Sequence, residues 1–198
     1  SGLYVRALCE GMDDLPQADE ALREEMNRWL AEEGLGALAE KLRELDPEYY
    51  QIVDLNNPAR VVRALEVCLQ TGMPYSRQRT GERRERPFEI IKIGIDLPRE
   101  VLYDRINRRV DQMLADGLEA EVRALYPYRE LNALQTVGYR EFFDYFDGRI
   151  GYDEAVELIK RNSRRYAKRQ LTWFRRDPEI RWFAPDDDAA IIAYVDSK

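Results

Sequence analysis

The sequence predicts a mainly α-helical fold with little β-sheet, and three observations lead to this prediction. Helical patterns with capping residues at their starts and glycine or proline at their ends follow one another along most of the 198 residues. The clearest strand pattern is the β-branched run at residues 88–96 (FEIIKIGID), with a weaker candidate at 180–183. The apolar character of 88–96 predicts burial on both faces, as in a parallel sheet. Two strands cannot form such a sheet, so we expect its partner strands in sequence outside these 198 residues.

The N-terminal part is expected to consist of short helices joined by polar turns. Ser1 can cap a helix that ends at Gly11, and Asp19 can cap one that ends at Gly34. Further helices are expected at 35–45, after Asp46-Pro47, and at 59–71, where Asn56-Asn57-Pro58 provides the cap and Gly72 the stop. Residues 13–78 are therefore predicted to form a helical subdomain, and the charged, unpatterned residues 79–87 a linker.

The C-terminal part, residues 88–198, combines the predicted strands with longer helices. A helix over 98–117 and a second over 118–126 precede a loop at 132–138 and a helix at 139–146. Asp153 is expected to cap a long basic helix that ends at Asp177-Pro178, and a last helix is expected at 186–195. Residues 1–12 are assigned to the same core as 88–198, which gives four parts: 1–12, 13–78, 79–87 and 88–198.

The composition limits the chemistry that the chain can carry out. It has no histidine, which removes the commonest general base and the commonest metal ligand. Its two cysteines, Cys9 and Cys68, match no metal-binding spacing and are predicted to be reduced core residues. No apolar run approaches the length of a membrane span and no leader pattern opens the chain, so a soluble, cytoplasmic protein without membrane contact is expected.

The stretch 160–176 (KRNSRRYAKRQLTWFRR) holds eight basic side chains and no acidic one, although the chain as a whole carries a formal net charge of −7. On a helix, Ala155, Ile159, Asn162, Tyr166, Arg169 and Trp173 form one stripe, and the other positions present a cationic face with interleaved aromatic rings. Such a face suits a polyanion such as RNA, whose unpaired bases can stack on aromatic side chains. A solvated helix whose arginines pair with carboxylates explains the same pattern equally well.

Three other sites could bind anions. Arg105 and Arg109 lie one helical turn apart, a spacing suited to a diphosphate, although pairing with Asp104, Asp111 or Glu119 is the simpler interpretation. Arg60 and Arg63 follow a helix cap, where backbone amides also attract anions, although a capped surface helix explains the pair at least as well. The segment 135–140 (QTVGYR) places a glycine, an aromatic ring and an arginine at the start of a helix, where they could approach a nucleotide closely or simply form a turn. No phosphate loop, GxGxxG motif or nucleophile elbow occurs, so the residues alone indicate an anion-binding protein without a complete catalytic site.

The motifs taken together resemble a known enzyme family. The opening SGLY, the stretches RALCEG, NNPARVVRALEV and TGMP, the helix DRINRRVDQMLADGLEAEV, the loop ALQTVGYREFF and the closing KRQLTWFRRDP resemble bacterial tRNA dimethylallyltransferase, in the family's order and over essentially the whole chain. The resemblance implies transfer of a dimethylallyl group from dimethylallyl diphosphate to N6 of the adenine 3′ of the anticodon. It also implies Mg²⁺ and an α/β core of the P-loop NTPase type with an inserted helical domain that grips the anticodon arm of tRNA.

The resemblance assigns roles to particular residues. Arg109 matches the arginine that binds the diphosphate and takes part in catalysis, with Arg105 one turn before it. Ser1 matches an element that lines the reaction channel and meets tRNA. Three further segments match those that contact tRNA: Ala59, Arg60, Val61, Val62 and Arg63; Gln135, Thr136, Val137, Gly138, Tyr139 and Arg140; and Lys168, Arg169, Gln170, Leu171, Thr172, Trp173, Phe174 and Arg175.

The sequence also departs from the family pattern. The phosphate loop and the aspartate thought to act as general base belong to a segment that precedes SGLY in the family. We therefore expect that the chain corresponds to the C-terminal two thirds of such an enzyme, that most of the Mg²⁺ site lies outside it, and that it is inactive by itself. A monomer is expected. Two alternatives stay open: a non-catalytic RNA-binding module, and an isopentenyltransferase that acts on free adenylate, which would have less need of the inserted helices and the basic segment.

Overall fold

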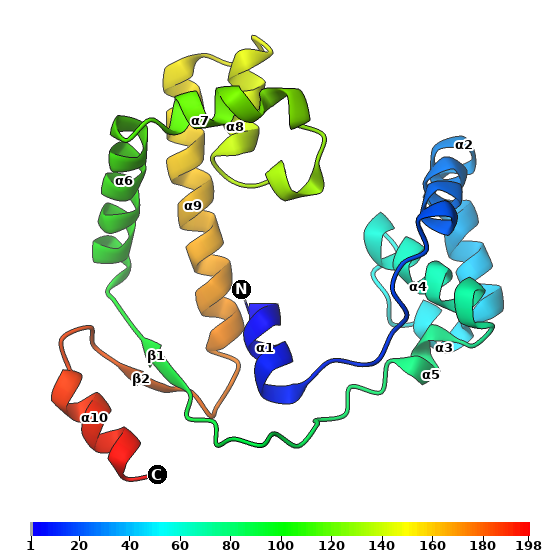
Figure 1. Cartoon of the computed structure of the whole chain (residues 1–198), viewed down its shortest axis with the longest axis horizontal. Helices are drawn as coiled ribbons and strands as arrows, with labels where there is room; N and C mark the ends of the chain where they lie inside the picture. The colour runs from blue at the N-terminus through cyan, green and yellow to red at the C-terminus, as the bar shows by residue number, and fades with distance from the viewer. Residues whose placement is uncertain (1) are drawn as a thin grey trace. The chain divides into compact units, whose positions relative to one another are not determined.

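The computed structural model describes residues 2–198, which form two compact units. We call Leu3–Phe88 the helical unit, and Glu89–Lys198 together with Gly2 the sheet unit. The mainly helical fold class is confirmed, with one small parallel sheet among the described residues (Figure 1). The four-part division at residues 12, 78 and 87 stays a prediction. Within the described range, no helix combines the length and the apolar character that a membrane crossing requires.

The helical unit contains five helices, of which the first begins at Gly2 of the other unit: α1 (Gly2–Glu10), α2 (Glu20–Leu45), α3 (Pro47–Tyr50), α4 (Pro58–Thr71) and α5 (Tyr75–Gln78). The predicted caps at Asp19 and Asn57 are present, since Asp19 accepts a hydrogen bond from the amide of Leu22 and Asn57 accepts one from the amide of Arg60; the predicted cap Ser1 lies outside the described residues. Gly34 adopts φ +82° and kinks α2, which is why the sequence reads as two helices there. The short helix α5 was missed by the sequence patterns.

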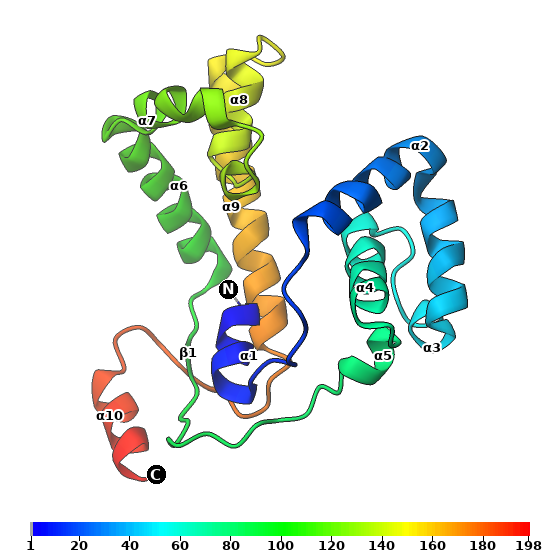
Figure 2. The same ribbon diagram turned by 45° about the vertical axis from the view of Figure 1, so that its right-hand side comes forward.

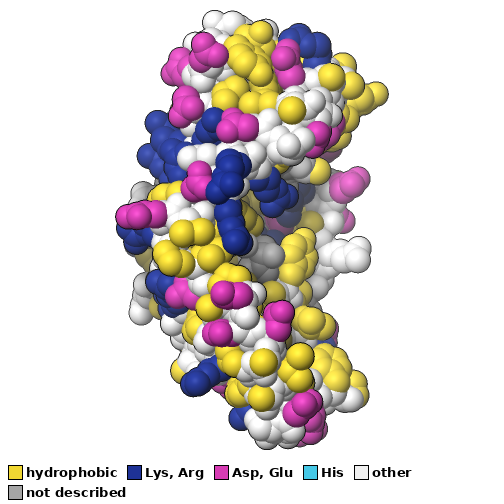
Figure 3. Space-filling model, turned by 90° about the vertical axis from the view of Figure 1, so that its left-hand side faces the viewer, with side chains coloured by type: hydrophobic (Ala, Val, Ile, Leu, Met, Phe, Trp, Pro, Cys, Tyr) yellow, Lys and Arg dark blue, Asp and Glu magenta, His cyan; other side chains and the backbone are white. Residues whose placement is uncertain are grey.

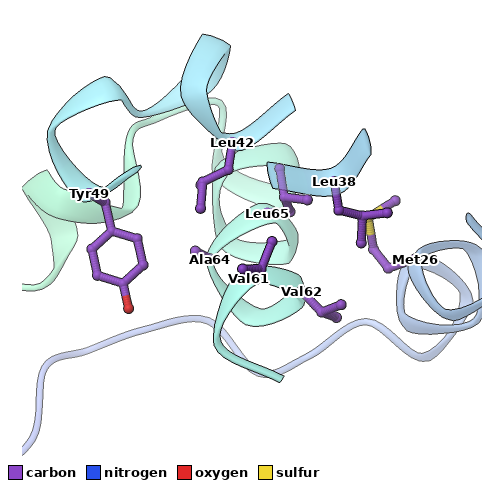
Figure 4. Close-up of a cluster of buried hydrophobic side chains, with 8 residues drawn as sticks. All are labelled: Met26, Leu38, Leu42, Tyr49, Val61, Val62, Ala64 and Leu65. Carbon is purple, nitrogen blue, oxygen red and sulfur yellow. The ribbon is translucent and has the colours of Figure 1, made fainter. Parts of the chain in front are cut away.

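The core of the helical unit lies between α2 and α4. Figure 4 shows Leu38 and Leu42 of α2 lying against Val61 and Leu65 of α4, and all four side chains are fully buried. Burial of each such side chain contributes about 1.5–3 kcal/mol to folding. Cys68 is buried as predicted, whereas the prediction was wrong for Cys9, which is only half-buried; both thiols are free.

Asp46 connects three elements of the helical unit. It is buried, accepts a hydrogen bond from the amide of Tyr49 at 2.9 Å, and accepts two from Ser76, from the amide at 2.6 Å and from the hydroxyl at 2.8 Å. The carboxylate therefore caps α3 and at the same time holds α5 against it, and these bonds compensate for its burial.

The sheet unit contains β1 (Ile93–Ile95), α6 (Arg99–Ala115), α7 (Leu118–Leu125), two 3₁₀ turns, η1 (Tyr126–Tyr128) and η2 (Asn132–Leu134), α8 (Tyr139–Phe146), α9 (Tyr152–Phe174), β2 (Arg181–Phe183) and α10 (Asp188–Asp196). Helices α6 and α9 pack side by side, and α8 covers the N-terminal half of α9 (Figure 2). Their shared core includes Val110, Val122, Phe142 and Ile159.

The strands are parallel but shorter than expected, with Gly94 opposite Trp182 and Ile95 opposite Phe183. The predicted strand over 88–96 is wrong outside Ile93–Ile95, because β2 offers only three residues for pairing. Burial on both faces is also not observed, since the exposed fraction of the Ile95 side chain is 47%. Asp153 lies in the first turn of α9 and is not its cap; the N-cap is Gly151.

Candidate functional site

Arg105 and Arg109 are exposed on α6, and neither guanidinium has a hydrogen bond or ion pair within residues 2–198. The three carboxylates that could have neutralised them pair with other cations: Asp104 with Arg108, Glu119 with Arg123, and Asp111 with Lys160. Arg105 and Arg109 therefore do not pair with these nearby carboxylates, which was the simpler interpretation of their spacing. Two unpaired guanidinium groups one turn apart remain available for an anion.

Helix α9 is fixed against α6 by two polar contacts as well as by its apolar stripe. Lys160 Nζ lies 2.6 Å from a carboxylate oxygen of Asp111, and Arg164 donates to the amide oxygen of Asn107 at 2.6 Å. Ala155 and Ile159 are fully buried, which confirms the predicted stripe for the first half of the helix. In the second half, Tyr166 and Trp173 of the same stripe are exposed by 44% and 45%. The aromatic rings there face outward beside the cations.

The outward part of α9 forms a hollow of about 460 Å³, which we call the α9 groove. Its lining residues are four cations, one threonine and one tryptophan: Arg165, Lys168, Arg169, Thr172, Trp173 and Arg176. None of the four cations forms an ion pair within the described part of the chain. The Arg169 guanidinium lies over the Tyr166 ring at 5.7 Å. Figure 3, which views the molecule from the side of α6, shows Lys and Arg side chains gathered near the middle of that face.

The other members of the predicted segment 168–175 are held within the unit. Arg175 donates to both carboxylate oxygens of Asp96, at 2.9 and 3.0 Å, and lies over the Trp182 ring. Gln170, Leu171 and Phe174 are half-buried. Of the eight residues predicted to meet tRNA in this segment, Lys168, Arg169, Thr172 and Trp173 line the α9 groove.

A second hollow of about 720 Å³ lies at the carboxyl ends of β1 and β2. It shares Lys168 and Thr172 with the α9 groove and is also lined by Arg99, Tyr103 and Trp182. Sequence reasoning did not single out these last three residues. The signal that could have found Arg99 and Trp182 is their position shortly after β1 and within β2, where α/β proteins commonly place ligand-contacting groups; Tyr103 lies one turn further along α6 and gave no such signal.

The segment 135–140 is shaped by three hydrogen bonds. Gly138 adopts φ +100°, which favours glycine, and its amide donates to Glu141 Oε2 at 2.8 Å. Tyr139 donates its hydroxyl to Glu121, and this bond raises the pKa of Tyr139 above its usual range. Gln135 donates to the carbonyl of Arg129 at 2.6 Å. The side chains of Thr136 and Arg140 are exposed, whereas Val137 packs against the core.

The segment 59–63 lies at the start of α4 in the helical unit. Arg60 is exposed, but Val61 and Val62 are buried in the core, so their side chains are not available to RNA. Arg63 donates to the carbonyl of Pro16 at 2.6 Å and lies 3.5 Å from the fully buried carboxylate of Glu66, which also pairs with Arg23. The side chains of Val61, Val62 and Arg63 therefore have structural roles. Ala59 and Arg60 remain the candidates for tRNA contact in this segment. Ser1 lies outside the described residues.

No metal-binding cluster occurs in the described range, because no three His, Cys, Asp or Glu side chains gather closely enough to hold an ion. The Mg²⁺ that the resemblance implies, most of whose site is expected outside this chain, stays a prediction.

Comparison with known proteins identifies the family. The sequence profile described as IPP transferase matches residues 1–177. A tRNA dimethylallyltransferase of Cytophaga hutchinsonii is 54% identical over 198 residues, which are 100% of this chain and 65% of that protein. The chain thus spans slightly less than two thirds of this relative.

Solved structures agree. The tRNA isopentenylpyrophosphate transferase of Bacillus halodurans is 40% identical with a TM-score of 0.59, covering 100% of this chain and 63% of that one. The corresponding transferase of Staphylococcus epidermidis is 31% identical with a TM-score of 0.57, covering 100% of this chain and 67% of that one. The chain therefore belongs to the IPP transferase family.

Proposed function

We propose that this chain forms the greater part of a tRNA dimethylallyltransferase, which transfers a dimethylallyl group from dimethylallyl diphosphate to N6 of the adenine 3′ of the anticodon. The α9 groove carries the proposal, because its four unpaired cations and its exposed tryptophan offer what an anticodon loop requires. The relatives are named as transferases that act on tRNA, which supports the same substrate. We further propose that the enzyme is cytoplasmic and monomeric.

In the proposed reaction, N6 of adenine forms a bond to the allylic carbon while the bond between that carbon and the diphosphate oxygen breaks. The electron pair of the broken bond leaves with the diphosphate, and the amine loses a proton to a base that the resemblance places outside this chain. Arg109, with Arg105 beside it, binds the departing diphosphate and stabilises the charge that develops on it. Mg²⁺, which the resemblance implies, would add positive charge beside the departing diphosphate.

The adenine has to leave its stack to reach the donor. An anticodon loop suits this requirement because its bases are unpaired, and extrusion of an unpaired base is inexpensive. An enzyme for free adenylate would have less need of a cationic groove, so the α9 groove favours tRNA over that alternative.

A chimaera tests the proposal. Residues 1–198 would replace the matching 65% of the Cytophaga hutchinsonii relative, and the product would be assayed for dimethylallyl transfer to an anticodon stem-loop. We expect the chimaera to be active, and Arg109→Ala to lower kcat by about 10²-fold or more while the affinity for the stem-loop stays the same. Arg108→Ala is the matched control, because Arg108 lies on the same helix but is paired with Asp104. Equal loss of kcat in both variants, or loss of RNA affinity in Arg109→Ala, would contradict the role of Arg109.

A further inference from the structure

Trp173 is held in the α9 groove by an unusually close neighbour. Gly2 lies against its indole, so that a Cβ atom at position 2 would fall 2.3 Å from Nε1, 2.4 Å from Cδ1 and 2.8 Å from Cε2. Real Cβ atoms do not approach other heavy atoms this closely, and the indole is rigid. Any side chain larger than that of glycine would therefore displace the whole ring. Gly2 and Trp173 belong to the same compact unit.

The conformation of Gly2 does not explain why glycine stands there. Gly2 opens α1, and its φ angle is not among the positive values found at seven other glycines of the chain. Space for the indole is thus the physical reason that the structure offers for glycine at this position.

Although Gly2 covers part of the ring, 45% of Trp173 remains exposed. The exposed part borders the groove whose other lining side chains are the cations Arg165, Lys168, Arg169 and Arg176. A large aromatic surface that is fixed from one side, open on another and surrounded by cations has the properties of a stacking site for a nucleobase whose phosphates meet the cations. If Trp173 were a core residue, its ring would be buried. If it were a loosely held surface residue, it would not need a glycine beneath it.

We propose that Trp173 is a stacking platform for an unpaired base of the bound RNA and that Gly2 is the residue that positions it. This inference rests on the proposed function, because it names the element of the RNA that the α9 groove receives. It makes Gly2 a positioning residue, which acts only through Trp173. The platform is independent of charge, so it should contribute affinity without contributing to the salt dependence of binding.

A double-mutant cycle on the 198-residue chain tests the proposal, with an anticodon stem-loop as the probe and fluorescence anisotropy as the measurement. Trp173→Ala should weaken binding about 5- to 150-fold, and Trp173→Phe should restore part of it, because phenylalanine can still stack. Gly2→Ala should weaken binding about threefold or more in the wild-type background and should have no effect in the Trp173→Ala background. None of these substitutions should change the slope of log K against log salt concentration.

Gly36→Ala is the matched control. Gly36 also lies within a helix, its φ is not positive, and no atom would meet its Cβ within 4 Å, so this variant should bind like the wild type. Additive effects of Gly2→Ala and Trp173→Ala would overturn the positioning role of Gly2. Wild-type affinity in Trp173→Ala would overturn the platform while leaving the proposed function intact. A failure of the wild-type chain to bind the stem-loop would overturn both.

Discussion

Asn162 of α9 donates a hydrogen bond to Glu141 of α8 at 2.7 Å, and the other oxygen of the same carboxylate accepts the amide of Gly138 at 2.8 Å. Glu141 is buried, with an exposed fraction of only 6%. One carboxylate therefore joins the segment 135–140 to the helix that carries the basic residues. The sequence placed Asn162 on the stripe of α9 that packs, but it gave no sign of the partner 21 residues away.

Asn162→Ala should destabilise the sheet unit. The substitution leaves one buried carboxylate oxygen of Glu141 without its donor, which costs about 1–3 kcal/mol in the free energy of unfolding. Urea denaturation measures this loss, and amide hydrogen exchange at Gly138 should accelerate because its acceptor is less firmly held. Arg161→Ala serves as the control, since Arg161 is exposed on the same helix. If both variants unfold at the same urea concentration, Asn162 has no such role.

Arg63→Ala should lower stability and not the salt dependence of RNA binding. Its guanidinium holds the carbonyl of Pro16 at 2.6 Å and lies beside the fully buried Glu66, so its removal should cost about 1–3 kcal/mol. Arg60→Ala, three residues earlier and exposed, should change stability by less than about 0.5 kcal/mol. Thermal unfolding of the two variants distinguishes them. A stable Arg63→Ala variant with a smaller salt slope would instead show that Arg63 contacts phosphate.

The ion pairs of Lys92 should make the stability of the folded protein depend on pH. Its ammonium lies 2.7 Å from carboxylate oxygens of Asp177 and of Glu179, and these bonds, the one to Asp177 first, raise the pKa of Lys92 above its ordinary 10.5. Because the folded state holds the proton more tightly, the stabilisation is fully present below the unfolded pKa of about 10.4 and disappears as the pH rises through the higher folded value.

Lys92→Met provides the measurement. The variant should be less stable than the wild type by on the order of 1 kcal/mol at about pH 9, and the difference should shrink as the pH rises through the folded pKa of Lys92. Comparing the two proteins removes the contribution of other groups that titrate in this range, such as Tyr139. A difference that stays constant across the range would mean that the ion pairs contribute nothing.

Local chemistry predicted a large part of this fold. Asp19 and Asn57 cap their helices, Gly72 ends α4 in a left-handed conformation, and α8 has the predicted bounds, because capping depends on residues three or four positions apart. Strand length could not be predicted in this way. Ile90 and Ile91 have strand-like character but no partner, since β2 pairs only with Ile93–Ile95.

The candidate site likewise has features that the sequence predicted and features that it did not. The basic segment and the arginine pair on α6 were visible as sequence patterns, whereas the pairing state of each cation was not. Asp104 pairs with Arg108 and not with Arg105, and Arg175 is held by Asp96, 79 residues away. Such competition between cations for the available carboxylates depends on tertiary packing, which the spacing of residues along one helix does not encode.

The most direct test of the central claim is the affinity of the 198-residue chain for an anticodon stem-loop across a salt series. We expect binding that weakens with salt and falls when the adenine 3′ of the anticodon is changed. Lys168→Ala and Arg169→Ala should each reduce the slope of log K against log salt by about 1, while Arg123→Ala, whose guanidinium is paired with Glu119, should leave it unchanged. A slope that is the same in all four proteins, or binding that ignores the adenine, would contradict the assignment of the α9 groove to tRNA.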